Sequence, residues 1–235
     1  MKNIMSKSFY ILMIVNLFLT CNAFAEKNNL KYSLSFVQMG MDYNEYYNGI
    51  WQDGESANLT KIIGYDMNFG FLFNRSSESV NEIYVDIMQL GGYSAYDGFT
   101  RSAHTPLQGT TSNQFIDASL AYKYTYRYDR LLDLYAGVGI GYHSWDRKLS
   151  SIQEELYEWN SIRPSIGANI KIQQFDLGMF VEYQYGFNAT MSASDTGDKY
   201  KLGGADVVVV GFPLRYNYDR NLEFFAQYTL STQTI

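Results

Sequence analysis

The sequence is poor in several residue types, and each scarcity excludes a class of protein. A single cysteine among 235 residues cannot form an intrachain disulfide framework or a cysteine-based zinc site. Proline occurs only 3 times and charged residues make up 18%, whereas a disordered chain would be rich in both and poor in aromatic residues. Acidic residues outnumber basic ones, 24 to 18, which argues against nucleic acid as a partner.

Long apolar runs are also absent, and the one short run lies at the start of the chain. Lys2 and Lys7 precede an apolar stretch over 9–19, which is followed by the small residues Ala23 and Ala25. This order is typical of a secretory signal peptide, and we expect cleavage after Ala25. The stretch is shorter than the ~20 apolar residues of a membrane-spanning helix. The expected division is therefore a signal peptide over 1–25 and a mature domain over 26–235.

The only cysteine, Cys21, lies inside the expected signal peptide. A mature chain without cysteine suits passage through an oxidising periplasm, where stray thiols would pair wrongly. The alternative is that Cys21 carries a lipid anchor, although Thr20 before it fits such a site poorly.

Beyond residue 25, apolar and aromatic residues alternate with polar and small ones, which is the pattern of strands with two different faces. The clearest examples, 63–73 and 116–128, place apolar or aromatic residues at almost every second position. The pattern predicts nine strands, at 30–46, 59–73, 80–91, 114–128, 132–145, 159–172, 175–187, 206–218 and 221–233.

The length of the alternating runs and of their connections favours a membrane barrel over a soluble sandwich. Soluble strands usually have ~5–6 residues, and a membrane-spanning strand needs ~9–11, which these runs reach. Short connections (74–79, 129–131, 173–174, 219–221) alternate with long ones (48–58, 92–112, 146–158, 189–205), and aromatic residues gather beside the short ones. The predicted fold is all-β: a membrane-spanning, antiparallel, up-and-down β-barrel of 8–10 strands.

Nine strands are an odd count, whereas bacterial single-chain barrels have an even number. We expect a ten-stranded barrel whose last strand is missing from this chain. The rival is an eight-stranded barrel in which one of the nine strands is misassigned, with the first strand as the foremost candidate. In that strand the apolar residues change phase near Phe36–Gly40. Either a β-bulge lies there, or the upper part of the strand projects beyond the membrane.

Charged residues fall on the inward-facing positions of the predicted strands. The lumen of so small a barrel is filled by side chains, and buried charges must pair. The sequence therefore predicts a lumen network that sets register and rigidity, with a narrow polar channel as the alternative. Its members are Asp66, Asp86, Asp117, Lys123, Arg127, Arg163, Lys171, Glu182, Arg215 and Glu223.

Candidate chemistry is limited to His143, Trp145 and Asp146, which the pattern places near the outer rim. A histidine beside carboxylates could act as a general acid or base. The sequence lacks the Asp-x-His of omptin proteases, however, and the His-x-Ser of lipid A deacylases, because Trp145 stands two places after His143. We therefore expect no enzyme, no metal and no cofactor. Loop acids such as Asp53, Glu55, Asp195 and Asp198 are expected to be solvated.

Through its alternating runs, the segment 26–235 resembles the small outer-membrane barrels of the OmpA transmembrane-domain, OmpX and OmpW-like group. The resemblance implies the outer membrane of a bacterial cell and roles in envelope integrity, surface interaction or passage of small solutes. The expected partners are outer-membrane lipid and an extracellular ligand or surface contacted through the outward loops, with a monomer favoured. The competing hypotheses are a narrow pore or carrier and a hydrolase at the rim.

Overall fold

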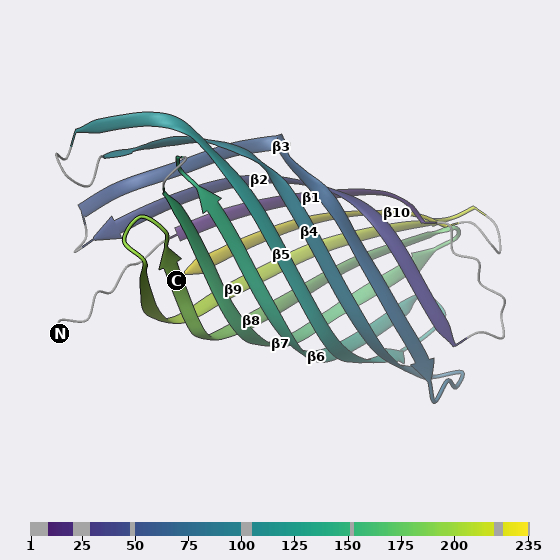
Figure 1. Cartoon of the computed structure of the whole chain (residues 1–235). Helices are drawn as coiled ribbons and strands as arrows, with labels where there is room; N and C mark the ends of the chain where they lie inside the picture. The colour runs from purple at the N-terminus through teal and green to yellow at the C-terminus, as the bar shows by residue number, and fades with distance from the viewer. Residues whose placement is uncertain are drawn as a thin grey trace.

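The computed structural model describes residues 9–20, 29–47, 50–99, 105–150, 153–218 and 223–234, and ten antiparallel strands run through them. Each strand pairs with its sequence neighbours, and β1 and β10 pair with each other, so the sheet closes into a barrel (Figure 1). The strands are β1 (Phe9–Thr20), β2 (Leu30–Tyr47), β3 (Ile50–Phe73), β4 (Ser79–Phe99), β5 (Pro106–Arg127), β6 (Leu132–Lys148), β7 (Glu154–Ile172), β8 (Phe175–Ala193), β9 (Asp198–Asn217) and β10 (Glu223–Thr234).

The structure confirms the predicted fold class. Each of the nine predicted strands corresponds to one of β2–β10, so the eight-stranded alternative, which discarded one of them, is wrong. The ends beside the short turns were predicted closely: β4 begins at Ser79, β6 at Leu132 and β8 at Phe175. Closure satisfies the backbone donors and acceptors that an open sheet would expose to lipid.

The tenth strand is not missing from this chain. It is β1, which occupies the apolar stretch predicted to belong to the signal peptide. In register, β1 runs from Tyr10 opposite Gln233 to Thr20 opposite Glu223, and its other edge pairs with β2. Since β2 and β10 run in the same direction, a strand between them must be antiparallel to both, as β1 is. Cleavage after Ala25 stays a prediction, because that junction lies outside the described residues.

The four long loops predicted from the sequence are mostly strand, which corrects that expectation. Residues 50–58, 92–99, 106–112 and 198–205 continue the ladders of β3, β4, β5 and β9. The reason is that these segments satisfy their backbone groups by pairing with one another even though they lack apolar alternation. The barrel is therefore drawn out at one end, where the β3, β4 and β5 ribbons reach furthest (Figure 1).

The outer face of the barrel changes from apolar to polar along the strands. The apolar part, which we call the girdle half, ends at the turns 74–78, 128–131 and 173–174. Its exposed outward side chains include Leu34, Val85, Leu120, Ile140, Ile166, Met179 and Phe212. The remainder, the extended half, has polar outward residues such as Asp42, Asp97, Gln114, Lys148 and Glu154. Only the girdle half therefore presents a face that lipid would accept.

The side chains that face the lumen change in the opposite direction, towards apolar residues in the extended half. In the extended half the inward side chains form a buried apolar cluster that includes Met39, Met41, Ile62 and Leu90. The phase change in β2 has this cause: its alternation is continuous, but its apolar residues switch from the lipid face to the lumen near Val37. The bulge expected near Phe36–Gly40 is not in this strand.

The irregularity lies on the neighbouring strand instead. Met39 pairs with Ile62 and Met41 with Ala57, so β3 has the four residues 58–61 where β2 has only Gly40, an excess of three. The pairing of β3 with β4 shifts over the same segment, between Ser56 and Ile62. A bulge of this kind reverses which residues of β3 point inward, and it places Glu55 and Asp53 on the lumen side of the extended half.

Candidate functional site

Several charged side chains in the lumen of the girdle half form ion pairs that join different strands. Glu82 accepts Lys123 Nζ at 2.7 Å and Lys31 Nζ at 3.4 Å. Lys171 Nζ lies 2.6 Å from Asp133 Oδ2. Lys123 and Lys171 belong to the predicted network, whereas Glu82, Lys31 and Asp133 are not in the list of its predicted members.

Asp117 on β5 is the centre of a second group. Its two carboxylate oxygens accept Arg163 Nη1 at 2.6 Å and Nη2 at 2.8 Å, and Oδ2 lies 3.2 Å from His143 Nδ1. The His143 ring stacks on the indole of Trp159, with 4.0 Å between ring centroids. The nearby Ser161 hydroxyl accepts Arg163 Nε at 2.7 Å. A bidentate arginine–carboxylate pair of this kind fixes two strands relative to each other.

Four of the other predicted lumen residues contact polar or aromatic groups in the described segments. Asp86 accepts a hydrogen bond from Asn68 at 3.0 Å, and Glu182 accepts one from Gln184 at 2.9 Å. Arg127 donates to the Ser76 carbonyl at 3.3 Å. The Arg215 guanidinium lies 5.5 Å from the centroid of the Phe225 ring. Asp66 Oδ1 is buried without a hydrogen-bond partner in the described residues. The side chain of Glu223 lies outside the described residues.

The three residues of the predicted rim group do not share a face of the sheet. His143 and Trp145 point into the lumen, where His143 contacts Asp117 and Trp145 is buried. Asp146 alternates to the outer face, where its carboxylate lies 3.6 Å from Lys148 Nζ. The structure therefore does not bring a histidine and a carboxylate of this group together.

A fully buried arginine, Arg147, joins three strands inside the extended half. Its Nε donates to Glu55 on β3, its Nη1 to Glu155 Oε2 on β7 at 2.9 Å, and its Nη2 to Asp53 Oδ1 on β3 at 3.4 Å. Both Arg147 and Glu55 have side chains with 0% exposure. We call these four residues the Arg147 clasp. Because β3 and β6 are separated by two other strands in the sheet order, the clasp spans the lumen.

The intervening strands also contribute to the clasp. Glu55 Oε2 accepts the Ser94 hydroxyl from β4 and Asn113 Nδ2 from β5 at 3.4 Å. The side-chain oxygen of Asn113, Oδ1, in turn accepts a hydrogen bond from Trp145 Nε1 at 2.7 Å. A buried carboxylate with this many donors is well compensated for the loss of water.

Aromatic rings pack directly below the clasp. Trp145 stacks on Tyr157 at 5.2 Å and on Phe115 at 5.5 Å between centroids, and it meets Tyr43 edge-on at 5.3 Å. The Arg147 guanidinium lies 4.8 Å from the Tyr43 ring centroid. Together with the apolar cluster, these rings fill the lumen of the extended half with side chains.

The electrostatics of the clasp follow from three carboxylates facing one guanidinium. Burial opposes the charged form of Arg147, but the Tyr43 oxygen and the Glu55 carboxylate outweigh it and hold its pKa well above the usual value. Burial raises the pKa of Asp53 to about 6, against the opposing pull of Arg147. Asp53 is therefore a member of the clasp whose protonation state changes at mildly acidic pH.

The sequence did not reveal this group. Asp53 and Glu55 were expected in a solvated loop, which is wrong for both, since Glu55 is buried and Asp53 is part of the clasp. Arg147 was not singled out at all. The signal that could have found it is the alternation of His143, Trp145 and Arg147, which carries the inward face of β6 past its predicted end.

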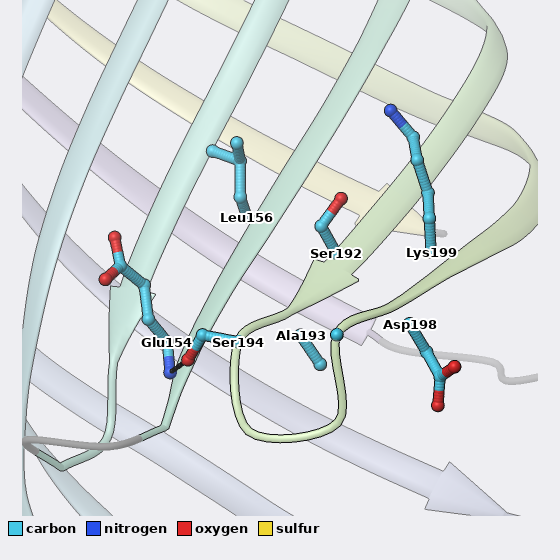
Figure 2. Close-up of a pocket in the computed structure, with 8 residues that line it drawn as sticks. Glu154, Leu156, Ser192, Ala193, Ser194, Asp198 and Lys199 are labelled. Carbon is cyan, nitrogen blue, oxygen red and sulfur yellow. Dashed lines mark hydrogen bonds between the residues drawn. The ribbon is translucent and has the colours of Figure 1, made fainter.

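A small hollow opens at the tip of the extended half between β7 and the β8–β9 turn. Its volume is about 280 Å³, and Figure 2 shows Glu154 and Lys199 on opposite sides of it. The Ser194 hydroxyl accepts the Glu154 backbone N–H at 2.8 Å. No histidine lines the hollow, so its serines have no imidazole base beside them.

Within the described segments, no helix is long and apolar enough to cross a membrane. Within the same segments, no group of three or more histidine, cysteine, aspartate or glutamate side chains could hold a metal ion.

The known proteins to which the chain is similar are solved structures. No protein-family model matches it, and no curated protein matches it. Among solved structures it is similar to the outer membrane protease OmpT from Escherichia coli, with 9% identity, 98% of this chain and 96% of that chain covered, and a TM-score of 0.37. It is also similar to the TodX monoaromatic hydrocarbon channel, with 9% identity, 99% of this chain and 75% of that chain covered, and a TM-score of 0.35. A third similar structure is the β-domain of the Bordetella autotransporter BrkA, with 6% identity, 98% of this chain and 99% of that chain covered, and a TM-score of 0.37.

The resemblance is one of class, to outer-membrane β-barrel proteins. Similarity at these identities and scores carries no argument about activity. The barrel itself is established by the strand pairing of this chain, which closes without a free edge in the described residues.

Proposed function

We propose that this protein is a non-conducting, non-enzymatic barrel of the bacterial outer membrane, with a structural or surface-interaction role. The observation that carries the proposal is the filled lumen of the extended half. Trp145, Trp159, Leu90 and Arg147 are each at most 2% exposed, in a barrel too narrow to route a solute around them. A pore would instead need a continuous polar path.

The proposed orientation places the extended half outside the cell. Its outward face is polar, and its strands reach beyond the apolar band, as expected for a part that stands in water. In this orientation β2 begins at the girdle end, on the periplasmic side. Cleavage after Ala25 would remove β1, the strand that joins β2 to β10. Intact mass of the protein extracted from outer membranes therefore distinguishes a cleaved chain, without residues 1–25, from the closed ten-stranded barrel, which retains β1.

The binding surface in this proposal is the outer wall of the extended half rather than a set of long loops. Paired strands hold exposed side chains such as Tyr93, Leu107 and Tyr200 on a fixed scaffold. A rigid surface loses little conformational entropy when it binds a partner. This wall replaces the outward loops that the sequence predicted as the place of recognition.

Conductance in planar bilayers tests the proposal. Wild-type protein, shown to be folded by a boiling-dependent shift in gel mobility, is expected to give no unitary current. Arg147→Ala removes the central side chain of the clasp, whereas Lys123→Ala removes a lumen charge of the girdle half; only the first is expected to produce leak currents. Stable openings of the wild-type barrel would contradict the proposal and favour the narrow-pore alternative.

A further inference from the structure

A basic hollow lies at the girdle end of the barrel, far from the Arg147 clasp. It has a volume of about 460 Å³ and is lined by Ser77, Arg127, Asp129, Arg130 and Lys171. These residues come from the turn after β3, from the end of β5 with its following turn, and from β7. Three of the four charged side chains in the lining are positive, in a chain whose net charge is −6.

The one acidic residue of the hollow is engaged by its own turn. Asp129 Oδ1 accepts the backbone N–H groups of Leu131 at 2.7 Å and Leu132 at 2.8 Å. An aspartate used in this way fixes the turn. This turn holds Arg130 at the mouth of the hollow. The Arg130 side chain is exposed and makes no hydrogen bond or ion pair within the described residues.

The two other basic side chains are held by the fold. Arg127 Nη1 donates to the Ser76 carbonyl at 3.3 Å, and the Arg127 backbone N–H donates to the Glu78 carbonyl at 2.7 Å. Lys171 pairs with Asp133. The Arg127 guanidinium has five N–H donors in all, so most of them remain for a ligand.

Strand alternation decides which compartment the hollow faces. Arg127 and Lys171 occupy lumen-facing positions, whereas the adjacent residues Tyr126, Tyr128 and Ile172 are exposed on the lipid face. The hollow therefore opens through the mouth of the barrel into water, which is the periplasm in the proposed orientation.

We propose that this basic hollow binds a soluble anion with two or more phosphate or carboxylate groups. Guanidinium groups bind such oxyanions through paired, charge-assisted hydrogen bonds. Arg127 at the end of β5 and Arg130 in the turn that follows provide two such forks, whereas the charge of Lys171 is already paired with Asp133. The same oxyanion chemistry occurs in phospholipid headgroups, but the lumen-side position favours the soluble source.

Calorimetry with inorganic diphosphate on the purified, folded barrel tests the proposal. Wild-type protein is expected to bind diphosphate, with an affinity that falls as salt rises. Arg130→Gln should weaken binding about tenfold, since one set of charge-assisted hydrogen bonds is lost. Arg75→Gln is the matched control: it removes one exposed arginine from the same end of the barrel but outside the hollow, and it should leave the affinity within about twofold.

Several outcomes would overturn the proposal. They are an absence of diphosphate binding to the wild type, an affinity unchanged by Arg130→Gln, or an equal loss in both variants, which would mean general charge attraction. Nanodiscs with and without anionic lipid separate the two sources of oxyanion. If anionic lipid binds at Arg130 and diphosphate does not bind, the assignment to a soluble ligand is overturned. Because the purified barrel has no compartments, these results do not depend on the proposed orientation.

Discussion

The girdle half and the extended half of this barrel are built from the same strands but bury opposite kinds of side chain. In the girdle half, apolar residues such as Leu120 and Ile166 face outward, while Asp117, Arg163 and Lys123 pair inside. In the extended half the outward residues are mostly polar, and the lumen holds aromatic and aliphatic residues around the Arg147 clasp. The difference shows that each half turns its apolar face away from water: towards lipid in one case and towards its own interior in the other.

The comparison predicts that the two charge networks differ in importance. Arg147→Ala leaves Glu55 and Glu155 buried without their cation, which should destabilise the fold by about 3–5 kcal/mol. Lys123→Ala leaves Glu82 with Lys31 as a remaining partner, and Lys123 is 26% exposed, so a clearly smaller loss is expected. Urea unfolding of the two variants in the same detergent measures the difference. Equal losses would mean that the clasp is not the more important of the two networks.

A pair of identical substitutions tests the apolar residues of the two halves. Leu90→Ala opens a cavity in the packed lumen, where Leu90 is 1% exposed, and should cost about 2–4 kcal/mol. Leu120→Ala alters the lipid-facing surface, where the side chain is 47% exposed and lipid can fill the space, so it should cost less than about 1 kcal/mol. Unfolding free energies within error of each other would contradict the assignment of Leu90 to a packed core.

The smallest expected effect is a pH dependence confined to the extended half. The pKa of Asp53 is raised to about 6 in the folded state, so the folded protein holds this proton more tightly than the unfolded chain does. The stabilisation from this group is complete below the unfolded value of about 4 and is lost as the pH rises through about 6. A rise of about two pKa units corresponds to at most about 2–3 kcal/mol. Stability measured from pH 4 to pH 8 should therefore fall less in Asp53→Asn than in the wild type; parallel curves would exclude the effect.

The sequence predicted the girdle half far better than the extended half, and the reason is physical. In the girdle half the lipid requires an apolar residue at nearly every outward position, so alternation marks both the strands and their ends. Asp117, Lys123 and Arg163 were found because lumen charges stand out against that pattern. In the extended half, water on one side and a mixed interior on the other leave a weaker alternation, and β3 reverses its phase at the bulge. Glu55, Asp53 and the clasp partner Arg147 were therefore not recognised as a group.

The sequence of β2 shows that its apolar residues move from one face of the strand to the other, but it does not show the cause of this change. A bulge and the edge of the membrane both move apolar residues from one parity to the other. Only the register of β2 against β1 and β3 distinguishes them. The closing strand had no lipid-type alternation either, because Phe9–Thr20 is apolar at almost every position and matches a signal peptide equally well.

The position of the membrane along the strands tests the account most directly. Cysteine would be placed singly at Ile166 or at Gln114, with Cys21 replaced, because both residues are exposed on the outer face, one in each half. Each variant would carry a nitroxide label in lipid bilayers. The account predicts that the label at position 166 collides mainly with oxygen dissolved in lipid, and the label at position 114 mainly with a water-soluble nickel chelate. Lipid-like accessibility at both positions would contradict the division of the barrel into a girdle half and an extended half.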